Sequence, residues 1–123
     1  MKVIVAGSRD IDDYELVCKA IEASGFEITL LISGGARGVD KCGETWADER
    51  GIQKAVFPVT GLQWRTRGKG VGHARNRLMG DIADALVAVW DGTSPGTKGM
   101  IDYAKAKGLK VCIYPSHPKV GEK

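Results

Sequence analysis

Short apolar runs alternate with segments of helical spacing along this chain, and this alternation restricts the fold more than any other feature. The expected strands cover residues 2–6, 28–32, 53–59, 85–90 and 110–114. Four helices are expected between them, the first capped by Asp12 or Asp13 and closed by Gly25. Successive parallel strands need such crossovers, and right-handed crossovers place helices on both faces of the sheet. We therefore predict an α/β fold, a three-layer α/β/α sandwich with a five-stranded parallel sheet.

The length and composition fit one ordinary globular domain. We place this domain at residues 1–115 of the 123 and a polar tail at 116–123. No apolar run approaches the roughly 20 residues that cross a bilayer, and the N-terminus lacks a signal-peptide pattern. We therefore expect a cytoplasmic protein without a membrane partner. The cysteines are three in number and widely spaced, so we expect neither a disulfide framework nor a metal site.

A glycine-rich turn at residues 33–40 joins the second expected strand to the second helix. Its glycines, Gly34, Gly35 and Gly38, permit positive φ and close approach of another group to the main chain. The helix that follows offers unpaired amides and a partial positive charge, which favour an anion. The turn therefore predicts either a phosphate-binding site or a tight connection.

Three such turns follow expected strands, at residues 7–9, 33–40 and 91–97. In open parallel sheets, ligands bind beyond the carboxyl ends of the strands. Because all three turns lie at that edge, we expect them to form one binding crevice.

The candidate ligand and phosphate contacts combine these turns with the fourth helical stretch: Gly7, Ser8, Arg9, Gly34, Gly35, Ala36, Arg37, Gly38, Asp40, Arg75, Asn76, Asp91, Gly92, Ser94, Gly96 and Thr97. Each has a structural alternative. The hydroxyls of Ser8 and Thr97 can bind phosphate or cap helices, and the arginines can bind phosphate or pair with Asp10, Asp40 and Asp91. Asp40, Glu44 and Asp91 are the carboxylates available for acid–base work.

Residues 60–70 are expected to form a polar, basic loop that contains Trp64. Its tryptophan can stack on a base or belong to the core. Basic side chains gather in and just after this loop and can attract a polyanion or form a solvated surface: Arg65, Arg67, Lys69, Arg75 and Arg77.

Motifs from all these regions together resemble the SLOG superfamily, and most closely its small YspA-like members. They are Gly7-Ser8-Arg9, then Gly34-Gly35-Ala36-Arg37-Gly38-Val39-Asp40, then Trp64, Gly72-His73-Ala74-Arg75-Asn76-Arg77-Leu78-Met79, and Gly96-Thr97. The resemblance implies a Rossmann-like fold. It also implies kinship with the Lonely Guy phosphoribohydrolases, which cleave nucleoside monophosphates, and with DNA-processing protein A, which binds single-stranded DNA.

Two departures from these relatives bear on function. In the phosphoribohydrolase motif a catalytic glutamate follows the Gly-Thr pair, and Met100 stands at that position here. A thioether cannot act as an acid or a base. Arg75 matches an arginine of the phosphoribohydrolases, whereas Glu44 replaces the motif histidine of the DNA-processing type.

We therefore expect a protein that binds a nucleotide-derived phosphate ligand, such as a nucleoside phosphate or an ADP-ribose-like molecule, as a sensor or sequestering module. The alternatives are an N-glycosidic hydrolase of the phosphoribohydrolase kind and, more weakly, a single-stranded DNA-binding protein. No tightly bound cofactor is required beyond that ligand. The apolar helix faces allow a homodimer.

Overall fold

The computed structural model describes residues 1–68 and 70–116. For Arg67, within the first range, it describes the backbone but not the side chain. The predicted tail at 116–123 lies outside the described residues except for Ser116, and so does Lys69 of the basic stretch.

Five strands and five helices alternate along the described chain. The strands are β1 (Lys2–Gly7), β2 (Leu30–Ser33), β3 (Gln53–Val56), β4 (Ala85–Trp90) and β5 (Lys110–Pro115). The helices are α1 (Tyr14–Ser24), α2 (Val39–Glu49), α3 (Gly61–Arg67), α4 (Gly70–Ile82) and α5 (Pro95–Ala106).

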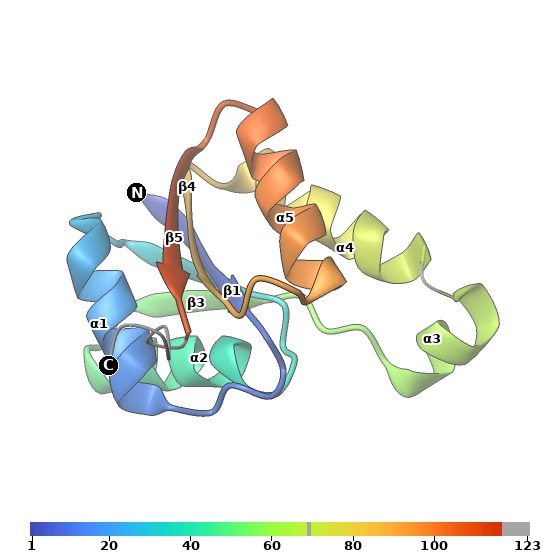
Figure 1. The fold of residues 1–123 in the computed structure, drawn as a ribbon, viewed down its shortest axis with the longest axis horizontal. Coiled ribbons are helices and arrows are strands. Elements are labelled where there is room, and N and C mark those ends of the chain that lie inside the picture. Colours follow the sequence, from blue (N-terminus) through green and yellow to red (C-terminus); the bar gives the residue numbers. More distant parts are fainter. Residues whose placement is uncertain (69, 117–123) are drawn as a thin grey trace.

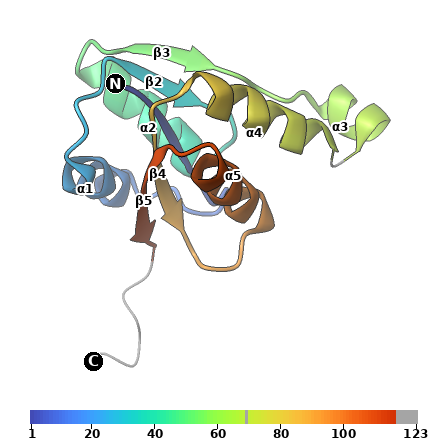
Figure 2. The ribbon, with the colours of Figure 1, turned by 90° about the horizontal axis from the view of Figure 1, so that it is seen from above.

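All the strands are parallel, in the order β3-β2-β1-β4-β5. Helices α1 and α2 cover one face of the sheet, while α4 and α5 cover the other (Figures 1 and 2). The predicted Rossmann-like three-layer sandwich with a five-stranded parallel sheet is therefore confirmed. The strand order changes direction between β1 and β4, and crevices in such sheets open at that point.

Two hydrophobic clusters flank the sheet, because successive side chains of a strand point to opposite faces. Val3 and Val5 of β1 belong to the cluster beneath α1 and α2, whereas Ile4 and Ala6 belong to the cluster beneath α4 and α5. The second cluster also includes Met100 of α5, which is 1% exposed. The position of the missing glutamate is therefore filled by a core side chain.

The structure differs from the sequence-based expectation at residues 60–70, where a helix replaces the expected loop. Thr60 begins α3 with a capping box: its hydroxyl accepts from the Gln63 amide at 3.1 Å, and the Gln63 side chain accepts from the Thr60 amide at 2.8 Å. This reciprocal pair satisfies amides that a helix start otherwise leaves free. Both views show α3 projecting beyond the sheet at the start of α4 (Figures 1 and 2).

Gly7, the last residue of β1, provides a test of how closely β1 packs against its neighbours. A Cβ added there would lie 2.2 Å from the Val89 carbonyl oxygen and 2.7 Å from Val39 Cγ2. We expect Gly7→Ala to lower the free energy of unfolding in urea by roughly 2–3 kcal/mol, because overpacking forces the backbone to shift. Gly61→Ala is the control, since its Cβ would meet only Arg65 Nη1, at 3.7 Å. Equal urea midpoints for the two variants would contradict this view of the packing.

Candidate functional site

A cavity of about 630 Å³ opens at the carboxyl ends of β1 and β4. The predicted site residues that line it are Gly7, Ser8, Arg9, Ala36, Asp40, Trp64, Arg75, Asn76, Ser94, Gly96 and Thr97. An adjoining hollow of about 250 Å³ shares Arg9, Ala36, Trp64 and Arg75 with the cavity and adds Gly34, Gly35, Arg37 and Val59. The three predicted turns thus meet in one region.

Four predicted residues line neither space in the described structure: Gly38, Glu44, Asp91 and Gly92. Gly38 has φ +79°, and a Cβ there would lie 2.6 Å from the Ser8 carbonyl oxygen. Glycine at this position therefore permits the turn after β1 to contact the start of α2, so the role of Gly38 is structural. Glu44 is buried, and its Oε2 accepts a 2.7 Å hydrogen bond from Ser33 Oγ.

The Asp91 carboxylate shapes the turn before α5. Its Oδ1 accepts from the amides of Thr93 and Ser94, both at 2.8 Å, and its Oδ2 accepts from Ser94 Oγ at 2.9 Å. These bonds, led by the one from the Thr93 amide, hold the pKa of Asp91 well below its usual range. The side chain is thereby committed to the turn as a hydrogen-bond acceptor.

The first turn of α5 has free hydrogen-bond donors at the cavity. Ser94 is the N-cap residue, but its hydroxyl contacts Asp91 and, at 2.9 Å, Ser8 Oγ instead of capping the helix. Within the described residues, the amides of Gly96 and Thr97 have no acceptor. Both residues line the cavity, and the positive end of the helix dipole lies there. This turn can therefore hold an anion.

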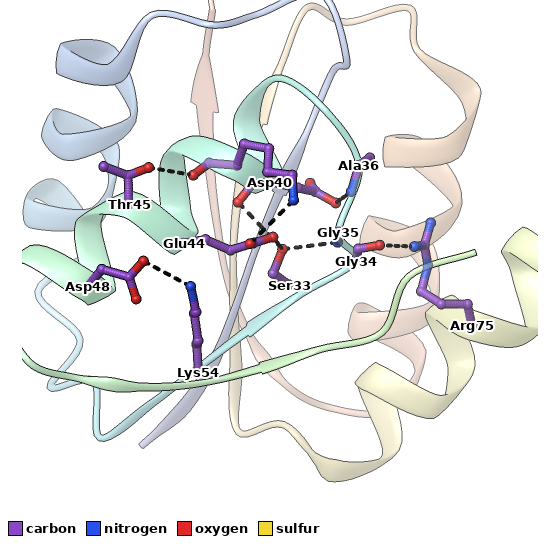
Figure 3. A network of polar contacts seen from close by, with 11 residues as sticks. Ser33, Gly34, Gly35, Ala36, Asp40, Glu44, Thr45, Asp48, Lys54 and Arg75 are labelled. Atoms are coloured by element: carbon purple, nitrogen blue, oxygen red, sulfur yellow. Dashed lines mark hydrogen bonds and ion pairs between the residues drawn. The ribbon is translucent and has the colours of Figure 1, made fainter. Parts of the chain in front are cut away.

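The glycine turn after β2 uses its own amides internally (Figure 3). Ser33 Oγ accepts from the Gly35 amide at 3.1 Å, and Asp40 Oδ2 accepts from the Ala36 amide at 3.2 Å. Ser33 is fully buried and was not among the predicted site residues. Two amides of this turn therefore donate hydrogen bonds within the protein and are not available to a phosphate.

Arg75 of α4 ties this turn to its surroundings. Its Nη1 donates to the carbonyl of Gly34 at 2.6 Å and to that of Phe57 at 3.2 Å, and its Nε donates to Asn76 Oδ1 at 2.9 Å. Burial lowers the pKa of Arg75, while the charge of Asp40 opposes that shift. A Cβ on Gly34 would lie 2.6 Å from Arg75 Nη1 and 2.8 Å from Asp40 Oδ2. Glycine at position 34 is what allows both groups to lie there.

Asp40 is a buried residue at the cavity wall, 5% exposed. Burial raises the pKa of Asp40 to about 6, against the opposing effects of the Ala36 amide and the charge of Arg75. Among the three carboxylates considered for acid–base work, only Asp40 lines the cavity in the described structure.

Trp64 reaches the cavity from α3. The Arg9 guanidinium lies 5.6 Å from the ring centroid, within cation–π range. Behind the ring, a Cβ on Gly72 would lie 2.8 Å from Trp64 Cη2, so glycine permits α4 to approach the indole. His73, part of the motif around Arg75, is exposed and also lines the cavity. No sequence signal distinguished it from a solvated residue.

Comparison with known families decides the relationship of this chain. The model of the family described as YspA, cpYpsA-related SLOG family (YAcAr) matches residues 1–64, just over half of the chain. The chain belongs to this SLOG family. The predicted resemblance is thereby confirmed.

Among solved structures, this SLOG family member is similar to DNA processing protein A from Streptococcus pneumoniae, with a TM-score of 0.74 and 21% sequence identity. The match covers 98% of this chain and 52% of the other, so this chain spans about half of that protein. At 21% sequence identity, this similarity shows the fold alone. Comparison with curated protein sequences gave no significant match.

None of the described helices of this SLOG protein combines the length and apolar character needed to cross a bilayer. Its described His, Cys, Asp and Glu side chains form no group of three or more that could hold a metal ion.

Replacing Asp40 tests its burial. Because its pKa is higher in the folded protein than the ordinary value of 3.8, ionised Asp40 costs stability that protonated Asp40 does not. From pH 4 to pH 7, wild type should lose roughly 2 kcal/mol of unfolding free energy relative to Asp40→Asn. Urea unfolding at several pH values measures this, with Glu15→Gln at an exposed position of α1 as the control. Parallel pH profiles for wild type and Asp40→Asn would show that Asp40 is not buried as described.

Proposed function

We propose that this protein binds a nucleotide-derived phosphate ligand, a nucleoside phosphate or an ADP-ribose-like molecule, in the cavity between the turns. The observation that carries the proposal is the free first turn of α5, where the amides of Gly96 and Thr97 have no acceptor among the described residues and lie at the cavity wall. Membership of the SLOG family supports a nucleotide-related role in general terms.

The phosphate would bind at this turn. A helix N-terminus with free amides favours phosphate oxygens, since the donors and the helix dipole act together. The Thr97 hydroxyl lines the same wall and can add a hydrogen bond to another phosphate oxygen, whereas the Ser8 hydroxyl would first have to turn its proton away from Ser94 Oγ. The side chains of Ser8 and Thr97 are nearly buried, at 4% and 6% exposure, and are therefore already oriented.

The remainder of the cavity fits a nucleoside. Ala6, Met79 and Met100 provide an apolar wall, and Trp64 offers an aromatic surface for a base. The volume of about 630 Å³ falls within the roughly 300–1,000 Å³ of ordinary small-molecule sites.

Cleavage of an N-glycosidic bond in the same ligand is a second candidate function, which Asp40 favours. A carboxyl with a pKa of about 6 exists in both protonation states near neutral pH, as general acid–base catalysis requires. We rank binding first because Met100 supplies no carboxylate and Asp40 already accepts the Ala36 amide.

Binding is tested by thermal unfolding with AMP, ADP, ADP-ribose and short single-stranded DNA, followed by mass spectrometry of each mixture. A ligand at a hundred times its dissociation constant adds roughly 2.7 kcal/mol to stability. Stabilisation by a nucleotide recovered intact supports binding, and release of free base supports hydrolysis. Stabilisation by DNA alone, with steep salt dependence, would replace both candidates with nucleic-acid binding. No stabilisation by any of these compounds would refute the proposal.

The role of Trp64 is tested separately. We expect Trp64→Ala to weaken binding of the stabilising nucleotide roughly 5- to 150-fold, because stacking on one base contributes roughly 1–3 kcal/mol. Isothermal titration calorimetry measures the change. Leu62→Ala is the matched control, since Leu62 lies on the same helix, is 61% exposed and lines neither space. Equal affinities for the two variants would exclude stacking.

A further inference from the structure

The hollow beside the cavity has a strongly positive lining. Three arginines, Arg9, Arg37 and Arg75, line its 250 Å³, and no carboxylate does so among the described residues. The main cavity differs, because Asp10 and Asp40 lie in its wall together with Arg9 and Arg75.

The charges of these arginines are only weakly compensated. Arg37 pairs with Asp10 at 3.4 Å, but the two side chains are 75% and 91% exposed, and such pairs contribute little. Arg9 forms no ion pair within the described chain and lies over Trp64. The guanidinium groups are therefore available to an anion.

Arg75 provides the fixed member of the three. Its Nη1 and Nε are held by the carbonyls of Gly34 and Phe57 and by Asn76, so the group is already oriented. Its Nη2 has no hydrogen-bond acceptor among the described residues. Burial lowers the pKa of Arg75, the charge of Asp40 opposes this shift and the charge of Arg9 adds to it, so a bound anion would further stabilise the charged guanidinium.

We propose that the hollow is a second anion subsite, so that the ligand is a nucleoside carrying phosphoryl groups at two separate positions of its sugar. This inference rests on the proposed function, in which the first phosphoryl group binds at the start of α5. The residues 94–97 of that turn do not line the hollow, whereas Arg9, Ala36, Trp64 and Arg75 line both spaces. The nucleoside would therefore lie beside Trp64, between the two anionic groups.

Separate subsites favour separated phosphoryl groups over a chain of adjacent ones. A 5′-diphosphate places both of its phosphoryl groups on one side of the sugar, where they would compete for the same α5 amides. A 3′,5′-bisphosphate places one phosphoryl group on each side. Arginine suits the second position because its planar group binds phosphate through two hydrogen bonds.

The experiment compares AMP, ADP and adenosine 3′,5′-bisphosphate by calorimetry with wild type and Arg37→Gln. Arg37 lines the hollow and not the main cavity, and its ion pair with Asp10 of the cavity wall joins two exposed side chains, so removing its charge should affect that wall little. We expect the bisphosphate to bind wild type at least tenfold more tightly than AMP or ADP. In Arg37→Gln most of that gain should be lost, while affinity for AMP changes less than twofold. Arg37→Lys should restore part of the gain.

Arg77→Gln is the control, because Arg77 is exposed on α4 and lines neither space. A bisphosphate that binds no more tightly than AMP, or a gain that Arg37→Gln leaves intact, would overturn the second subsite while the proposed nucleotide binding stands. If none of the three nucleotides binds, the proposed function fails, and the second subsite fails with it.

Discussion

The hydrogen bond from Arg75 to the Gly34 carbonyl, 2.6 Å long, holds the site together. It joins α4, on one face of the sheet, to the turn that follows β2. The same guanidinium reaches the Phe57 carbonyl beyond β3, and the neighbouring Asn76 donates to the Gly96 carbonyl at the start of α5 at 3.4 Å. One stretch of α4 thus fixes three segments that are distant in sequence. The arrangement demands glycine at position 34, because a side chain would collide with the guanidinium.

The turn after β2 and the turn before α5 differ in how their backbone amides are used. The turn after β2 is satisfied by the protein's own oxygens: Ser33 and Asp40 accept its amides, and Ser33 in turn donates to Glu44 (Figure 3). The turn before α5 has the opposite arrangement, because Asp91 and Ser8 engage the capping serine and leave the helix amides free. The first turn therefore provides a rigid wall, and the second provides the donors.

Hydrophobic pattern predicted the fold because the sheet is buried on both faces. β4 (Ala85–Trp90) matches its expected bounds, because a parallel strand that is buried on both faces forms a continuous apolar run in the sequence. The prediction of a loop at residues 60–70 was wrong because it followed the polar, basic composition of the segment. Thr60 and Gln63 form a capping box there, and this pair starts a helix. For the site, sequence indicated which turns converge, since strand ends share an edge. It could not indicate which polar groups are already used: Asp91 and Glu44 look like free carboxylates until their hydrogen-bond partners are known.

Helix α3 stands apart from the rest of the fold. Among the described residues, it contributes none to the two hydrophobic clusters and only Trp64 to the cavity and hollow. Helix α3 itself can accordingly change in sequence with little cost to folding, provided that Phe57 before it still packs against the second cluster and accepts from Arg75. Selection for a new ligand would act first on this segment, while the sheet and the arginine of α4 stay unchanged. The molecule thus separates the part that must be inherited intact from the part that is free to evolve.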